Sequence, residues 1–394
     1  MKILGIITEY NPYHLGHRLH LQEAKKLIKP DLTICVMSSS FVQRGEPAMI
    51  SYQKRAAIAI EEGIDIVIEL PLVYACQSAD YFAKGAVTLL HEMGVTDLVF
   101  GSEDGNIETF IEIAEGIEQD PDTYNMKVKE GMKDGLRYPD ACNQALQFIL
   151  NKEVRTPNDL LGLSYVKEVV HHHYPISMHC IKRTNDYHAK DIEQISSATS
   201  LRIALKHGID VAHQLPGYET YKDSHFFTLE EFYPYLKYLI TFTPLEGLHM
   251  IEEGLDDRLY KVNQETCNLE ELINALTSKR YTRSRIQRML IHILLHNTKE
   301  EIKKAILEKY KDDDEVCEED IDLCFQDIES LIADGRLFAK DTFEDTALEF
   351  KKRQGVIKAI CLHVAHGCNL NCEYCFAGKG EYGGADKGLM SFEV

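Results

Sequence analysis

The chain of 394 residues is long enough for two or three domains, and its 44% hydrophobic and 27% charged residues are ordinary for a globular protein. No apolar run approaches the roughly 20 residues of a membrane span, and the first residues predict a buried strand instead of a secretory signal. We therefore expect a cytoplasmic protein with no membrane partner. The formal net charge of −20 argues against a nucleic-acid partner, but Lys279–Arg288 holds five bases and no acid.

The first part of the chain alternates strand-like and helix-like segments. Expected strands, rich in Ile, Val and Leu, are Ile3–Thr8, Leu32–Ser38, Ile64–Leu70, Asp97–Gly101 and Ile176–Lys182. Expected helices are His14–Ile28, Tyr52–Glu62, Ala79–Met93 and Asn106–Glu118. Apolar strands alternating with helices indicate a parallel sheet covered on both faces. We predict an α/β fold with a Rossmann-like nucleotide-binding domain over residues 1–215.

Leu-rich helical patterns replace this alternation after Thr228. They include Tyr235–Thr241, Leu269–Leu276 and Arg283–Leu295, so we predict a helical domain over residues 216–300. Residues 301–355 are strongly acidic and predict a helical linker, with an apolar stripe over Glu319–Leu337. Residues 356–394 differ again in character and form a fourth segment.

Two histidines lie in the stretch Tyr10–His17, between the first expected strand and the first expected helix. A strand-to-helix turn of this kind is where open α/β sheets bind nucleotide phosphates, because backbone N–H groups at a helix start face the anion. His14 and His17 are suited to donate to the phosphates, and Gly16 allows their close approach. The pair predicts chemistry at a phosphate of ATP.

A second element is expected to hold the opposite side of the leaving pyrophosphate. The stretch Ser196–Arg202 supplies hydroxyls, Ser197 among them, and the guanidinium of Arg202 just before a helix expected at Leu201–Lys206. His-x-Gly-His after the first strand, followed late by Ser-Ser-x-Thr-x-x-Arg, resembles the nucleotidylyltransferase superfamily. The combination predicts adenylyl transfer, in which positioning and electrostatics supply most of the rate.

Further motifs narrow the resemblance. They are Glu9–His17, Phe41–Ala48, Phe100–Glu103, Pro157–Gly162, Ile181–Arg183, Tyr187-His188 and Lys279–Arg288. Over residues 1 to about 297 the chain is similar to the tRNA(Met) cytidine acetate ligase family. The resemblance implies that acetate is activated with ATP to acetyl-adenylate, with Mg²⁺ expected. The acetyl group would then pass, without acetyl-CoA, to N4 of the wobble cytidine of elongator tRNA(Met).

The resemblance also implies which residues contact ATP. These are Ile7, Thr8, Glu9, Tyr10, Asn11, Pro12, Tyr13, His14, Leu15, Gly16, His17, Arg18, Leu19, His20, Gly101, Asn158 and Arg183. The basic run is the expected tRNA contact, since guanidiniums pair with phosphates and a tyrosine can stack on an unpaired base. Its candidate residues are Lys279, Arg280, Tyr281, Arg283, Arg285 and Arg288.

A different motif lies near the C-terminus. Cys368, Cys372 and Cys375 have the C-x₃-C-x₂-C spacing, at which three thiolates each bind one iron of a [4Fe–4S] cluster. The region resembles radical SAM maturases that install thioethers in six-cysteine peptides, and residues 308–350 resemble their peptide-recognition region. Because a partial barrel needs about 200 residues, we expect a fusion whose segment 356–394 is not a working radical SAM site.

Other functions stay open at this point. One is a small-molecule adenylyltransferase, which would not need the basic run. Another is a peptide-binding or radical SAM protein, supported by residues 308–394. A third is a fused product that binds ATP and activates acetate but does not deliver it to tRNA.

Overall fold

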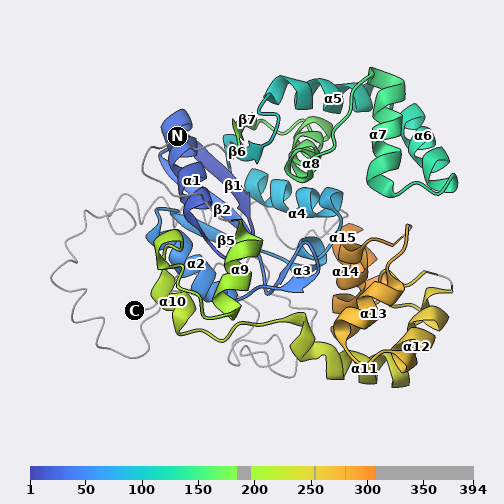
Figure 1. Ribbon diagram of the computed structural model, residues 1–394. Helices are drawn as coiled ribbons and strands as arrows, with labels where there is room; N and C mark the ends of the chain where they lie inside the picture. The colour runs from blue at the N-terminus through green and yellow to red at the C-terminus, as the bar shows by residue number, and fades with distance from the viewer. Residues whose placement is uncertain (184–196, 253, 280, 308–394) are drawn as a thin grey trace, which may run out of the picture. The chain divides into compact units, whose positions relative to one another are not determined.

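Five parallel strands form the central sheet of the computed structural model, which describes residues 1–183, 197–252, 254–279 and 281–307 (Figure 1). Their order is β5-β2-β1-β6-β7. The strands are β1 (Ile3–Thr8), β2 (Leu32–Ser38), β5 (Ile66–Leu70), β6 (Asp97–Ser102) and β7 (Ser177–Lys182). All five expected strands are present, so the predicted α/β class with a parallel sheet is confirmed.

The strand order places the topological switch point between β1 and β6. Crossover connections leave these two central strands toward opposite faces, and ligands of open α/β sheets bind in the crevice at the carboxyl ends there. Residues 9–14 follow β1, residues 103–106 follow β6, and Arg183 follows β7. Most of the predicted site residues therefore meet at one edge of the sheet.

Helices cover both faces of the sheet (Figure 1). On one face lie α1 (Leu15–Ile28), α2 (Tyr52–Glu61), α9 (Ala198–Lys206) and α10 (Tyr218–Lys222). On the other lie α4 (Ala79–Glu92), α5 (Ile107–Gln119) and α8 (Pro157–His171). Along β1, Leu4 and Ile6 are buried on the α1 side and Ile3 on the α4 side, as the two-residue period of a strand dictates.

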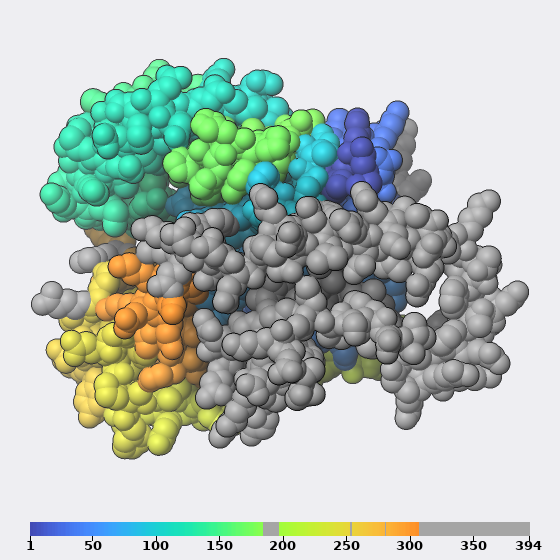
Figure 2. Space-filling model, turned by 180° about the vertical axis from the view of Figure 1, so that it is seen from behind, coloured from blue at the N-terminus to red at the C-terminus, as the bar shows by residue number. Residues whose placement is uncertain are grey.

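Three helices between residues 121 and 171 have no counterpart among the sequence expectations. They are α6 (Pro121–Lys133), α7 (Tyr138–Leu150) and α8. Asp120 caps α6 by accepting from the Thr123 N–H, and proline occupies the first turn of each of the three helices. Figure 2 shows α6 and α7 in teal on the surface of the molecule.

The helical region after residue 228 has a core of its own. Its helices are α11 (Tyr233–Phe242), α12 (Leu255–Glu265), α13 (Leu269–Leu276), α14 (Arg283–Leu294) and α15 (Lys299–Leu307). The apolar faces of α11 to α14 meet around Leu236, Leu259, Leu272 and Leu290, all essentially without solvent exposure. The buried residues of α15, Ile302 and Ile306, lie instead in the core on the α4 side of the sheet. A helix over Arg283–Leu295 was expected, and α14 confirms it within one residue.

Two histidines, the buried His292 and the half-buried His249, attach this region to the loop before α4. The His292 Nε2–H donates to the Cys76 carbonyl oxygen (3.1 Å), and His249 hydrogen-bonds the Gln77 amide (2.8 Å). The Asn297 amide donates to Nδ1 of His292 (3.0 Å), which fixes the tautomer of that ring.

Shorter elements complete the described chain. They are β3 (Phe41–Val42), β4 (Glu46–Pro47), α3 (Leu72–Ala75), η1 (Ala212–Gln214) and η2 (Leu229–Phe232). Met1–Lys358 and Ala359–Val394 cluster as two separate units, and every described residue belongs to the first. The boundaries at residues 215, 300 and 355 stay predictions. No helix within the described ranges is long and apolar enough to cross a membrane.

Candidate nucleotide-binding site

His14 and His17 are held by the start of α1. His14 is the N-cap, and its Nδ1 accepts from the Gly16 N–H (3.0 Å), while Nδ1 of His17 accepts from the His14 N–H (3.3 Å). The two rings stack with centroids 3.9 Å apart. Because each Nδ1 accepts from a backbone donor, the proton of each neutral ring resides on Nε2. Each ring thus keeps one N–H donor for a ligand.

The histidines of this turn are uncharged at neutral pH. Burial, reinforced by the charge of Arg183, lowers the pKa of His14 and of His20 to about 4. Burial also lowers the pKa of His17 well below its ordinary value, and the neighbouring histidines and Arg183 act in the same direction. Donors without charge can approach phosphate oxygens without repelling the nearby guanidiniums.

Arg183 supplies the positive charge at this edge. Its backbone N–H donates to the Ser102 carbonyl at the end of β6 (2.7 Å). Its aliphatic stem lies beside Gly101, where an added Cβ would come 3.4 Å from Cγ of Arg183. The structure therefore brings Gly101, Arg183 and the histidines of α1 to one place.

Asn158 reaches the same edge through a latch between α8 and the loop after β6. Its amide donates to Glu103, and the carboxylate of Asp159 accepts from the Ser102 hydroxyl (2.6 Å) and from the Glu103 N–H (2.8 Å). Burial alone would raise the pKa of Asp159, but these hydrogen bonds and one from Thr156 hold it below its ordinary value. A charged Asp159 therefore ties the start of α8 to the end of β6.

Arg202 reaches the β1–α1 turn from α9. Its Nη1 donates to the Asn11 carbonyl (2.8 Å), and its Nη2 donates to the Thr199 hydroxyl (3.3 Å). Ser197 is the N-cap of α9 and accepts from the Ser200 N–H (3.1 Å). The helix begins at Ala198, three residues before the expected start at Leu201, so Arg202 lies in its second turn.

Two residues that the sequence did not single out also support the turn. The guanidinium of Arg55 is fully buried and donates to the carbonyls of Glu9 (2.6 Å), Ser38 (3.0 Å) and Ser39, at the ends of β1 and β2. Burial lowers its pKa to about 10, so it stays charged at neutral pH. The hydroxyl oxygen of buried Tyr221 accepts from the Tyr13 N–H (2.9 Å).

Several residues of the expected ATP segment serve the fold. Arg18 pairs with both carboxylate oxygens of Glu62 (2.5 and 2.7 Å), which joins α1 to α2. Tyr10 and Tyr13 are buried in the core on the α1 side. Two kinds of group in this segment can still bind a phosphate. They are the Nε2 atoms of His14 and His17 and the start of α1.

The basic run is only partly presented to solvent. Lys279 is exposed, and Arg283 is exposed but paired with Glu270 (2.6 Å). Tyr281 is 9% exposed, its hydroxyl donates to Glu252 (2.9 Å), and the Arg285 guanidinium lies 5.1 Å from its ring.

Two further residues of the run take part in the fold. The Tyr281 ring packs in the helical core. Arg288 is half-buried and donates from Nη1 to the Gln43 carbonyl (3.2 Å). Arg280 lies outside the described residues.

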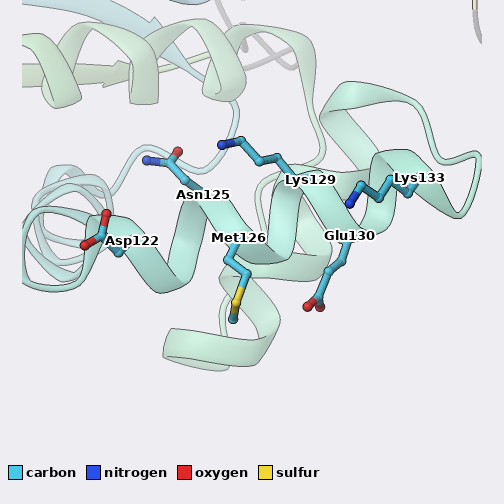
Figure 3. A pocket seen from close by; sticks show the side chains of 6 residues that line it. All are labelled: Asp122, Asn125, Met126, Lys129, Glu130 and Lys133. Atoms are coloured by element: carbon cyan, nitrogen blue, oxygen red, sulfur yellow. The ribbon is translucent and has the colours of Figure 1, made fainter.

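No group of three or more His, Cys, Asp or Glu side chains in the described ranges is arranged to hold a metal ion. Cys368, Cys372 and Cys375, predicted as iron ligands, lie outside those ranges. A hollow along α6 is lined by side chains of that helix alone and contains none of the predicted site residues (Figure 3). Its lining residues are Asp122, Asn125, Met126, Lys129, Glu130 and Lys133.

Comparison with known proteins gives matches over most of the chain. The family described as HIGH Nucleotidyl Transferase matches residues 1–313. A tRNA(Met) cytidine acetate ligase from Geobacillus sp. (strain WCH70) is 41% identical over 324 residues, covering 77% of this chain and 81% of the relative. The tRNA(Met) cytidine acetate ligase of Bacillus subtilis (strain 168) is 37% identical, covering 78% of this chain and 79% of the relative.

A solved structure is similar over the same extent. Thermotoga maritima TmcAL bound with alpha-thio ATP is 34% identical, with a TM-score of 0.71 and coverage of 78% of both chains. These matches give no support to the radical SAM resemblance, since the family match ends at residue 313, before Cys368.

Proposed function

Because this chain belongs to the tRNA(Met) cytidine acetate ligase family, we propose that it activates acetate with ATP and transfers the acetyl group to N4 of the wobble cytidine of elongator tRNA(Met). The observation that carries the proposal is the stacked pair of neutral imidazoles at the carboxyl end of β1. The charge of Arg183 acts on both rings, and Arg202 donates to the Asn11 carbonyl of the same turn, at the switch point of the sheet.

The first step is adenylate formation. A carboxylate oxygen of acetate attacks the α-phosphorus of ATP, and the bond from that phosphorus to the bridging oxygen of pyrophosphate breaks. The bond's electron pair leaves with pyrophosphate. The Nε2–H groups of His14 and His17 donate to phosphate oxygens as charge builds on them, and the two arginines and the start of α1 stabilise the same charge.

The second step is transfer to the cytidine. The N4 amine attacks the carbonyl carbon of acetyl-adenylate, AMP leaves, and the amine loses one proton to give N4-acetylcytidine. The overall reaction consumes acetate and ATP and releases AMP and pyrophosphate. Because the adenylate forms before tRNA reacts, the first step can be measured without tRNA.

ATP is the proposed nucleotide, with contacts drawn from the segment Ile7–His20 together with Gly101, Asn158 and Arg183. Mg²⁺ is proposed to enter with ATP, since in nucleotide enzymes it is bound largely by phosphate oxygens and water. The ligand-facing groups of the protein are then the imidazole donors and the guanidiniums.

The surface of α14 and the segment before it is the proposed tRNA contact. Lys279, Arg283 and Arg285 are its described members. Arg283 and Arg285 each pair with an acid, Glu270 and Glu252. Surface ion pairs of this kind are worth about 0–1 kcal/mol, so phosphates can replace the acids on binding. The affinity should then fall with rising salt.

One assay tests the proposal. Protein, ATP, labelled acetate and elongator tRNA(Met) are incubated, and nucleoside analysis follows the label. We expect labelled N4-acetylcytidine, together with acetate-dependent ATP–pyrophosphate exchange in the absence of tRNA. The absence of both reactions would refute the ligase function, and exchange without tRNA acetylation would identify a protein that activates acetate but does not deliver it.

The C-terminal cysteines are assigned no part in this reaction. Ligation of an iron–sulfur cluster by Cys368, Cys372 and Cys375 stays a hypothesis about residues outside the described ranges. We expect no radical SAM activity. Iron content and EPR spectra of anaerobically reconstituted protein provide the check. A stable [4Fe–4S] cluster that cleaves S-adenosylmethionine would contradict this expectation.

A further inference from the structure

We propose that Arg288 is a positioning residue for adenylate formation and not a tRNA contact. It acts through the loop of residues 43–46, here called the clasp, which joins α14 to the β1–α1 turn. The inference rests on the proposed function and assigns a role within its first step to a helix of the helical region.

The backbone of Gln43 in the clasp hydrogen-bonds both to α14 and to the residue that follows β1. The carbonyl of Gln43 accepts from Nη1 of Arg288 on α14 (3.2 Å). The N–H of the same residue donates to the carboxylate of Glu9, immediately after β1 (2.6 Å). The side-chain amide of Gln43 also donates to the Gln77 carbonyl (2.9 Å), which fixes the residue from a third direction.

A second residue of the clasp, Glu46, also links α14 to the β1–α1 turn. Glu46 accepts from the side-chain amide of Gln287 on α14 (3.2 Å) and lies 3.9 Å from Nη2 of Arg202. Arg202 in turn donates to the Asn11 carbonyl in the β1–α1 turn (2.8 Å). Adjacent residues of α14 thus reach the turn by two routes, one to Glu9 and one to Asn11.

The clasp lies directly against the backbone of α14 between these two contacts. Gly45 has a φ of +80°, and a Cβ added there would overlap the backbone nitrogen of Arg288. Its N–H donates to the Val42 carbonyl (2.9 Å), which closes the tight turn. Glycine is the residue that adopts this backbone conformation without a clash, so the contact between loop and helix is close.

The placement of Arg288 suits a positioning role. Its side chain is largely enclosed, and burial lowers the pKa of its guanidinium. A guanidinium taken out of water is costly unless it is hydrogen-bonded. Nη1 of Arg288 has the Gln43 carbonyl as its acceptor, while its Nε is buried without a hydrogen-bond partner. The bond to Gln43 fixes Glu9, and the turn that Glu9 begins carries both histidines. A shift of about 1 Å in such a turn can cost on the order of 10²-fold in rate.

Three variants test the inference by acetate-dependent ATP–pyrophosphate exchange without tRNA. Arg288→Gln should lower kcat of exchange at least tenfold, because the histidines of the turn are displaced. KM for ATP should change less than threefold, because the residues that bind ATP are kept. Arg288→Lys, whose ammonium can still donate to the Gln43 carbonyl, should restore most of kcat. Arg258→Gln is the matched control, since Arg258 also donates to a backbone carbonyl, that of Ala275, but within the helical region (2.8 Å); its exchange should be unchanged.

Binding of tRNA separates the alternatives. Filter binding should give the same affinity and the same salt dependence for Arg288→Gln as for the native chain. Normal exchange with weakened tRNA binding would overturn the inference and make Arg288 a phosphate contact. If exchange falls only in proportion to the unfolded fraction and the folded molecules are fully active, Arg288 has a structural role alone.

A further variant covers the case in which Arg288→Gln does not fold. Gln287→Leu keeps the side-chain volume but removes the bond to Glu46, and it should lower kcat in the same way. Normal exchange by Gln287→Leu would then overturn the inference. Absence of exchange in the native chain would refute the proposed function itself, and this inference with it.

Discussion

His14 and His17 each use one ring nitrogen for the fold and keep the other for a ligand. Nδ1 of each ring accepts from a backbone N–H, and this bond sets the tautomer before any nucleotide arrives. Burial keeps both rings neutral by lowering the pKa of each. The pair therefore offers two oriented N–H donors whose direction is decided by the first turn of α1.

Asparagine separates the two roles of each histidine. In His14→Asn and His17→Asn, the amide oxygen can accept the backbone N–H that Nδ1 accepts, and asparagine is a favoured N-cap. The donor at Nε2 is lost. We expect exchange to fall by about 10²–10³-fold, the usual cost of one donor to developing charge.

The thermal midpoint should change little in both variants, because the cap is kept. Circular dichroism melts beside the exchange assay provide the check. A variant that keeps full exchange would show that the corresponding Nε2 does not act on the leaving group.

At the scale of elements, the carboxyl edge is assembled by bonds between the starts and ends of neighbouring segments. Asp159, at the start of α8, ties down the loop after β6, and Arg202, on α9, ties down the loop after β1. Neither bond depends on the ligand. The helices thus fix the loops that are proposed to hold ATP. Binding residues commonly lie on loops that a rigid scaffold positions.

Asp159→Asn tests the latch on β6. The carboxylate accepts from Ser102, Glu103, Asp104 and Thr156, and an amide can accept at its oxygen only. We expect a loss of about 2–4 kcal/mol in the free energy of unfolding, since a buried network loses its charge. We also expect KM for ATP to rise several-fold because Asn158 and Gly101 shift.

Urea unfolding and exchange kinetics measure the two effects. Asp122→Asn, on exposed α6, is the control and should alter neither. An unchanged KM in a destabilised Asp159→Asn protein would limit the latch to a structural role.

At the scale of the molecule, four histidines with lowered pKa values govern the response to acid. Two of them lie at α1 beside the sheet, and two lie in the helical region. Burial lowers the pKa of His14, His20 and His249 to about 4 and that of His292 to about 3, from an ordinary 6.5. Between those values the unfolded chain binds protons that the folded chain does not. Stability is therefore full above pH 6.5 and is lost as the pH falls toward 4.

Each of these histidines adds to the loss, because its pKa is lower in the folded chain than in the unfolded chain. We expect the free energy of unfolding to fall steeply between pH 6.5 and 4.5, as measured by urea titration at several pH values. His249→Gln, which removes one of these four titrating rings, should reduce the slope. A flat profile over this window would contradict the buried, neutral state of the rings.

The fold was predictable to the extent that its signals are local. The five strands are Ile-, Val- and Leu-rich runs, and the His-x-Gly-His turn and Arg202 lie in short motifs. The helix α6 was not predicted because it is mostly polar, whereas the buried stripe of Ala141, Ala145 and Leu146 in α7 is a helical signal that could have been used. For α8, Thr156-Pro157-Asn158-Asp159 is a helix-start pattern that could have been used.

The parts of the site that were missed or misplaced depend on tertiary contacts. Arg55 and Tyr221 act on carbonyl and N–H groups far away in sequence, and nothing beside them in the chain indicates this. Tyr281 and Arg288 were assigned to tRNA from the charge of their run alone. The helix period of α14 turns Ile286, Met289 and Leu290 inward, and Arg288 is enclosed where the clasp covers the helix.

The bond from the Tyr13 N–H to the Tyr221 hydroxyl has a consequence for the order of synthesis. The histidine motif leaves the ribosome among the first residues of the chain, but two of its supports, Arg202 and Tyr221, are made about 190 and 210 residues later. A nascent chain that ends before Tyr221 carries the whole motif and both central strands of the sheet, yet it lacks the hydroxyl that holds the turn. The site is thus completed from the far end of its own domain, and a growing chain does not carry it in finished form.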